Sequence, residues 1–429
     1  MSKWKVIYGK KDINSLNEIV TKAIIVKFDD FMNNRLNLNK NEYHAIPIIT
    51  QNIVFLIYGI NLLADYENII SKLYISKLYI SKQTISETVS RKMFNNKIDT
   101  LLLTSKLTEK KITDADISSI INYFLELPVQ NYQFIKNVNG ICLKNNDKPC
   151  KLGPFILYNR SFYMQNIMLN PYKDNKDMDS ILWQGFTSDY IVTINIKARD
   201  TDKVKDIAYE LLNQLELFIY YSIGEPNPKF DITIVSRLAY PYENHLILCD
   251  QEITRSTQNN RIELIPLDVD YFKDVSIGND IIWTFINNSN LDEMKTRIVS
   301  AIEWIGKANS ENNIKNQLLF YLIAIESVFT RQEKTLVSPS IASTICESAA
   351  YVLSTDAQER ISIEKIIKEL YEIRSAIAHG SEKKITKENI KLACHISVSI
   401  VRQFLTNDEL KNICKIQDFA NYIKLKKYS

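Results

Sequence analysis

An arginine and a histidine near the C-terminal end of the chain are the residues best suited, by type and spacing, to do chemistry. They are Arg374 and His379, in the stretch Arg-Ser-Ala-Ile-Ala-His-Gly. A guanidinium can hold a phosphate by two parallel hydrogen bonds and stabilise negative charge as it develops. A histidine titrates near neutral pH and can give or take a proton. The pair would therefore suit proton transfer beside a bound anion.

Arg374 has an unusual position in its own helix. The segment from Ile361 to His379 predicts a helix, with Gly380 as its capping residue. The apolar residues of this segment share one face: Ile363, Ile366, Ile367, Leu370 and Ile377. At about 100° per residue, Arg374 falls inside that face. A charge there is costly unless it is paired or faces a cleft, so Arg374 is a functional residue or half of a buried ion pair, with Glu326 as a possible partner.

The spacing of the pair also bears on assembly. Five residues turn an ideal helix by about 140°, so Arg374 and His379 do not share a face of one straight helix. They would meet if the helix loosened at His379 and Gly380. They would also meet if two copies of the chain packed this helix against itself. The second arrangement is favoured and predicts a homodimer through the C-terminal helical region.

The surrounding sequence resembles the Apea-like branch of the HEPN domains. Arg374 to Gly380 matches the R-x-x-x-x-H signature, which is weak alone. Leu318 to Thr335 is similar to the first family helix, with its Ala-Ile-Glu-Ser core around Glu326. Ser340 to Leu353 and Lys368 to Gly380 resemble the second and third. Three helices in order make the resemblance fairly specific over roughly the last quarter to third of the chain.

The resemblance implies a helical bundle acting as a metal-independent endoribonuclease. Such domains work as dimers in bacterial defence against phage, as in abortive infection, or as toxins. RNA supplies its own nucleophile, the 2′-hydroxyl beside the scissile phosphate. His379 would move the proton and Arg374 would neutralise the phosphorane, with no metal and no cofactor. RNA and a second copy of the chain are the implied partners.

Two further residues are assigned supporting roles. Ser375 follows the arginine, where many HEPN nucleases carry Asn, Asp or His, and it can orient a neighbour but cannot do acid–base work. Glu326 is the candidate partner of Arg374, either structural or catalytic. The serine favours the alternative function, a non-catalytic HEPN scaffold that dimerises or binds RNA or nucleotide without cutting.

The elements around this site predict a multidomain α+β chain. Residues 1–135 look mainly helical, with unbroken runs at Asn52 to Ser71 and Thr113 to Leu127. Residues 136–290 form a mixed α/β domain. The two N-terminal regions are expected to sense an unknown trigger or to hold the nuclease off.

The middle domain carries the strand signals. Tyr190 to Lys197 alternates apolar and polar residues with period two. Lys203 to Ile223 predicts a helix, and Phe230 to Leu238 and His245 to Cys249 predict further strands.

Residues 291–429 are expected to be all helical. The predicted helices are Leu291 to Ala308, Asn312 to Thr330, Ser340 to Leu353, Ile361 to His379 and Lys387 to Leu405. His395 is expected to be a core or interface histidine, and the tail from Lys424 to Ser429 to be solvated and frayed.

Composition excludes several function classes. The 429 residues hold nine dispersed glycines, so there is no phosphate-binding glycine loop. None of the six cysteines lies in a C-x-x-C pair, which argues against a zinc site and favours reduced thiols. A net charge of +3 means that any RNA contact must be local. Without a signal peptide or a long apolar run, the protein is expected to be cytoplasmic, with no membrane partner.

Overall fold

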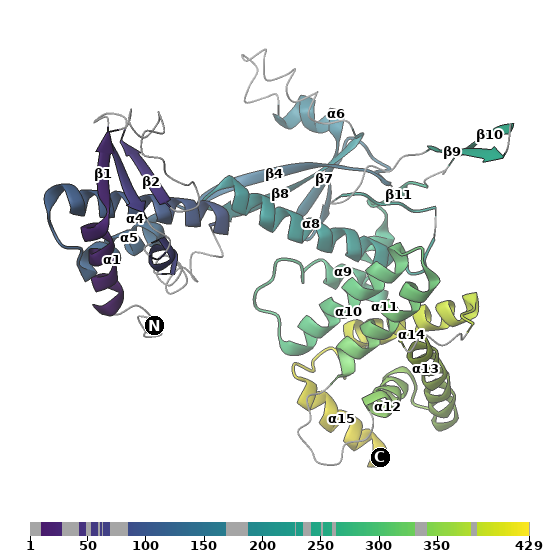
Figure 1. Ribbon diagram of the computed structural model, residues 1–429. Coiled ribbons are helices and arrows are strands. Elements are labelled where there is room, and N and C mark those ends of the chain that lie inside the picture. The colour runs from purple at the N-terminus through teal and green to yellow at the C-terminus, as the bar shows by residue number, and fades with distance from the viewer. Residues whose placement is uncertain are drawn as a thin grey trace. The chain divides into compact units, whose positions relative to one another are not determined.

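The structure is a computed structural model, and it divides into two compact units. It describes residues 10–27, 43–48, 53–58, 61, 63–68, 85–168, 188–227, 229–234, 242–249, 252–259, 263–330, 341–378 and 384–428. The first unit comprises Met1–Tyr132 and Ile196–Ile207, and the second comprises Gln133–Asn195 and Ala208–Ser429. The chain is mixed α+β, with a small sheet in its middle and a helical C-terminal region (Figure 1). The three-part division at 135 and 290 stays a prediction.

The first unit contains a sheet that the sequence did not predict. Helix α1 (Lys10–Lys22) precedes strands β1 (Ile24–Lys27), β2 (Tyr43–Ile48) and β3 (Ile53–Tyr58), which pair antiparallel in the order β1-β3-β2. The helix predicted over Asn52 to Ser71 is therefore wrong at its N-terminal end. A short apolar run suits a central strand as well as a buried helix, and periodicity alone does not separate them. The β-branched and aromatic residues of β3 favoured the strand.

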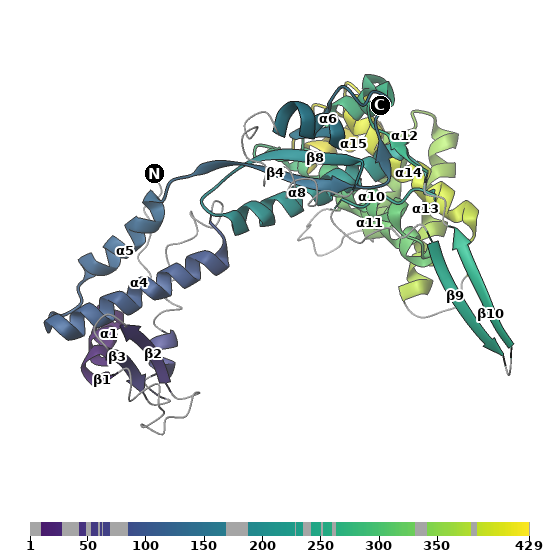
Figure 2. The same cartoon turned by 90° about the horizontal axis from the view of Figure 1, so that it is seen from above.

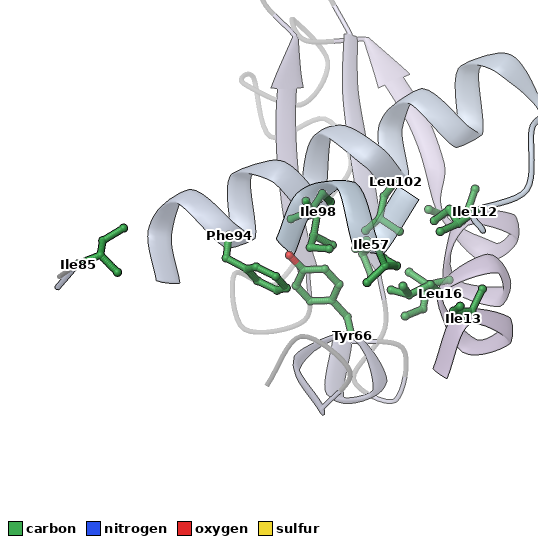
Figure 3. Close-up of a cluster of buried hydrophobic side chains, with 14 residues drawn as sticks. Ile13, Leu16, Ile57, Tyr66, Ile85, Phe94, Ile98, Leu102 and Ile112 are labelled. Carbon is green, nitrogen blue, oxygen red and sulfur yellow. The ribbon is translucent and has the colours of Figure 1, made fainter. Parts of the chain in front are cut away.

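Two long helices follow the sheet in this unit. They are α4 (Glu87–Thr108) and α5 (Asp114–Glu126), the second of which confirms the helix predicted from Thr113 to Leu127. Thr113 caps α5, because its backbone N–H and its hydroxyl both donate to the Asp116 carboxylate. Figure 3 shows the buried side chains that join α1, β3 and α4, among them Leu16, Ile57 and Ile98.

A buried polar cluster ties β2 to α4. The Tyr66 hydroxyl donates to Asp99 Oδ1 at 2.6 Å, and His44 Nε2 lies 3.1 Å from Asp99 Oδ2. The rings of His44 and Tyr66 stack with their centroids 4.8 Å apart. Burial and the Asp99 charge raise the pKa of Tyr66, so the phenol stays a neutral donor. The cluster satisfies a carboxylate that would otherwise be costly to bury.

The second unit begins with a four-stranded sheet. Strands β4 (Gln130–Val138), β6 (Cys150–Leu152), β7 (Phe155–Asn159) and β8 (Tyr190–Ala198) have the order β4-β8-β7-β6. Strand β8 confirms the predicted strand, with Val192, Ile194 and Ile196 buried, but Thr193 on the other face is buried as well, so only the end of the strand is half-buried. Helix α8 (Thr201–Ile223) follows as predicted. Strand β4 begins at Gln130, four residues after the end of α5 at Glu126.

Short elements lead from this sheet to the C-terminal helices. The described part of the strand predicted over Phe230 to Leu238 makes only a single bridge, Asn139 to Thr233. The predicted strand from His245 to Cys249 is confirmed within β9 (Tyr242–Cys249), which pairs antiparallel with β10 (Glu252–Asn259) in a hairpin (Figure 2). Strands β5 (Ile141–Cys142) and β11 (Ile265–Pro266) pair in parallel, and α9 (Asn279–Ile282) follows.

The prediction that the C-terminal region is helical is confirmed. These are α10 (Glu293–Ser310), α11 (Ile314–Phe329), α12 (Ile341–Leu353), α13 (Ala357–Ala378), α14 (Lys387–Thr406) and α15 (Ile416–Tyr428). Asp292, Asn313 and Thr386 cap α10, α11 and α14 with side-chain acceptors. Helix α11 packs against α10, α12, α13 and α14, which explains its nearly all-round apolar sequence.

Helix α15 corrects the expectation of a frayed tail. Phe419 packs against Phe329 and Phe404, with ring centroids 5.4 and 5.5 Å away. This aromatic anchor fixes a helix that continues to Tyr428. None of the described helices is both long enough and apolar enough to cross a membrane.

Candidate functional site

Arg374 on α13 pairs with Glu326 on α11. Its Nη2 atom lies 3.3 Å from both carboxylate oxygens of Glu326. The two side chains are 39% and 24% exposed, so this ion pair lies at the surface of the helical region rather than in its core. In a tight arginine–carboxylate pair, two guanidinium nitrogens each donate to one oxygen. Here one nitrogen faces both oxygens at a longer distance, so the contact is weaker. Arg374 is therefore partnered and also open to a ligand.

The burial of α13 explains this position. Ile367, Leu370 and Ile373 are buried, and they form the contact of α13 with its neighbours. Ile363, Ile366 and Ile377, which were expected on the core face, are only half-buried. The core face is thus narrower than predicted, and Arg374, four residues after Leu370, stands at its margin. At the edge of a buried face, an arginine can pack its methylene groups on apolar side chains while its guanidinium stays in contact with water.

One buried donor beside Glu326 lacks an acceptor. Among the described residues, no side chain or backbone group accepts a hydrogen bond from the buried Nε of Arg374. Burial, the Glu326 charge and a hydrogen bond with Glu326 raise the pKa of Tyr371, so its phenol remains protonated. A buried donor without an acceptor is unfavourable unless another group meets it. An oxyanion could accept from Arg374 at this position.

Tyr371 was missed from the sequence, although it lies three residues before Arg374. That spacing puts both residues on one side of a helix, which was the available signal. Cys346 on α12 lies near Tyr371. Burial raises the pKa of this cysteine to about 11, so its thiol is uncharged and is not an activated nucleophile at neutral pH.

Of the other predicted residues, Ser375 and His395 are described. Ser375 is exposed, and no described contact joins it to Arg374 or Glu326. His379 and Gly380 lie outside the described residues, which reach Ala378 on α13 and resume at Lys384. His395 is exposed on α14, so it is not a core histidine, and the alternative of an interface position stays a prediction. Its helix is amphipathic, and the apolar neighbours Cys394 and Ile396 turn inward on either side of it.

Within the described ranges, no three His, Cys, Asp or Glu side chains come close enough to hold a metal ion. The free thiols are those of Cys142, Cys150, Cys346, Cys394 and Cys414. No protein family, curated protein or solved structure was found to match the chain. The likeness to Apea-like HEPN domains thus rests on the residues quoted above.

Proposed function

We propose that the C-terminal helical region is a HEPN-type endoribonuclease that cleaves RNA without a metal ion. The observation that carries the proposal is Arg374, a half-exposed arginine with an unused buried donor, five residues before His379. The order of the surrounding helices supports it. The chain would act in the cytoplasm of a bacterium, in defence against phage by abortive infection or as a toxin. The N-terminal regions would answer to a trigger of unknown identity.

The proposed reaction needs only the RNA and the protein side chains. His379 accepts the proton of the 2′-hydroxyl, whose oxygen attacks the adjacent phosphorus. Arg374 donates hydrogen bonds to the phosphoryl oxygens as the phosphorane gains negative charge. The bond to the 5′-oxygen breaks, this oxygen takes a proton, and a 2′,3′-cyclic phosphate remains. Glu326 orients Arg374, and the neutral phenol of Tyr371 offers one more donor.

Cleavage should therefore survive removal of divalent metals. We expect purified protein to cut single-stranded RNA equally well with and without a chelator, leaving 2′,3′-cyclic phosphate or 3′-phosphate ends. The matched control is the same oligonucleotide made as DNA, which lacks the nucleophile and should stay intact. Gel electrophoresis and mass spectrometry of the products measure both results. A requirement for magnesium, or cutting of the DNA, would show that the proposed chemistry is wrong.

We also propose that the chain is a homodimer through its C-terminal helical region. An isologous interface near α13 would let the Arg374 of each copy meet the His379 of the other, which one straight helix does not allow. Light scattering at micromolar concentration should give twice the mass of the 429-residue chain. A monomer, both alone and with RNA, would remove this explanation of how the two residues meet.

A non-catalytic scaffold is the second candidate. Ser375 favours it, because a serine cannot replace the acid–base residue that many HEPN nucleases carry there. The existing contact of Arg374 with Glu326 also favours it, since a paired guanidinium is partly neutralised. Binding of RNA without any cleavage would support this reading.

A further inference from the structure

The carboxylate of Glu326 lies on the part of Arg374 that a phosphate needs. Nε and Nη2 share one edge of the planar guanidinium, and this edge can make two parallel hydrogen bonds to an oxyanion. Glu326 contacts Nη2 alone, which lies 3.3 Å from each carboxylate oxygen. The Nε donor of the same edge meets no acceptor in the part of the chain that the structure describes. The carboxylate therefore occupies the phosphate-binding edge without filling it.

Glu326 is also the side chain that has to move before a phosphate can use this edge. Because Arg374 Nε is buried, an oxyanion reaches both nitrogens only after a neighbouring side chain shifts. Glu326 is 24% exposed and stands on α11, which packs beside α13 (Figure 1). Partly exposed ion pairs of this kind are weak, so the contact can be exchanged. Since a phosphate and an ionised carboxylate repel each other, the two anions compete for one guanidinium.

Tyr371 gives the carboxylate a second partner. Its hydroxyl is buried beside Glu326, and the residue stands on α13 about one turn before Arg374. Burial and the Glu326 charge raise the pKa of the phenol, which stays a neutral donor. A carboxylate that leaves Arg374 can keep a hydrogen bond to Tyr371, so it does not become an unpaired charge. Glu326 thus has a place to go when a ligand takes the arginine.

We propose that the contact of Glu326 with Arg374 is autoinhibitory. In the free protein the carboxylate holds the guanidinium in place and blocks its phosphate-binding edge. An RNA phosphate takes both Nε and Nη2, and Glu326 keeps only its hydrogen bond to Tyr371. Glu326 and Tyr371 touch no reacting atom, so both are positioning residues. The inference rests on the proposed nuclease function, but the exchange of anions is a binding event and is measured without cleavage.

Binding of a fully 2′-O-methylated RNA to the full chain tests the exchange, because this RNA has no 2′-hydroxyl to attack. Glu326→Gln keeps the size of the side chain and removes the competing charge. We expect its RNA affinity to rise about fivefold, the factor by which two unit charges about 4 Å apart repel in water. Fluorescence anisotropy with a labelled RNA measures the dissociation constants.

Glu364→Gln is the matched control for the change of charge. Glu364 lies on α13, is 32% exposed and also pairs with a cation, Lys368, at 3.2 Å. Its substitution removes the same charge from the helical region but leaves Arg374 and its edge as they are. We expect the RNA affinity of this variant to stay within twofold of the wild type.

Tyr371→Phe tests the second position of the carboxylate. Without the hydroxyl, a displaced Glu326 has no donor, so RNA affinity should fall about threefold or more. The same substitution made together with Glu326→Gln should change affinity by less than twofold, because no charge is then displaced. This double-mutant cycle separates coupling between the two residues from a general loss of structure, which would weaken both Tyr371→Phe variants equally.

Cleavage gives a second, independent readout. Glu326→Gln should lower KM about fivefold and leave kcat within twofold, whereas loss of a catalytic or merely structural carboxylate would lower kcat. Unchanged or weaker RNA binding by Glu326→Gln, an equal gain in Glu364→Gln, or no binding by either the wild type or Glu326→Gln would overturn the proposal. The expected binding shifts in a protein that does not cut RNA would overturn the nuclease and leave the autoinhibitory contact standing.

Discussion

Replacing Arg374 with alanine should lower the rate of RNA cleavage by about a hundredfold or more, because the phosphorane would lose its charged donor. His379→Ala should cost a comparable factor by removing the group that moves the proton. Arg374→Lys should restore only part of the activity, since an ammonium keeps the charge but not the planar two-nitrogen contact. Initial rates on one RNA oligonucleotide, at equal protein concentration, measure all three variants.

Stability measurements separate this effect from a structural one. The pair of Arg374 with Glu326 is partly exposed, so its loss should lower the free energy of unfolding by about 1 kcal/mol at most. Arg360→Ala is the matched control on the same helix. Arg360 donates to the Ser354 and Thr355 carbonyls, at 2.9 and 2.8 Å, at the start of α13. Its loss should destabilise the helix start without changing cleavage. Wild-type cleavage by both the Arg374 and the His379 alanine variants would mean that the cleavage does not take place at this site.

The sequence predicted the helical region well because its signals are local. Capping residues such as Asp292 and Thr386 precede long amphipathic runs, and these mark α10 and α14 without reference to the rest of the chain. The sheet of the first unit was missed for the opposite reason. Strand β3 is fixed by pairing with β1 and β2, and its apolar run has no period of its own to reveal that pairing.

The candidate site could be predicted in part. The arginine that interrupts an apolar face identified Arg374, and the family helix identified Glu326 as its neighbour. The width of the buried face could not be read from α13 alone, because α11 and α12 decide which of its residues are covered. A pocket lined by Glu225, Asn309 and Lys387 had no sequence signal, since its walls come from three segments that lie far apart in the sequence.

The close approach of α8 and α10 provides the test of packing with the largest expected effect. Three contacts recur every three residues along both helices: Gln214 with Glu303, Leu217 with Gly306, and Tyr220 with Asn309. The middle contact is between backbones. A Cβ added at Gly306 would lie 2.2 Å from the Leu217 carbonyl oxygen and 2.8 Å from its carbonyl carbon. No rotamer change relieves a clash with backbone, so the two helices would have to separate.

Gly306→Ala should therefore lower the free energy of unfolding by about 3 kcal/mol or more. The sign of the effect is what makes the test decisive. In a helix without this contact, the same change would stabilise the protein by about 1 kcal/mol, because alanine has the higher helix propensity. Denaturant unfolding followed by tryptophan fluorescence measures the difference, with the exposed Thr296→Ala on the same helix as control. Separation of the helices would also break the bond from Asn309 to the Tyr220 carbonyl. A stabilised Gly306→Ala protein would mean that α8 and α10 do not meet at this glycine.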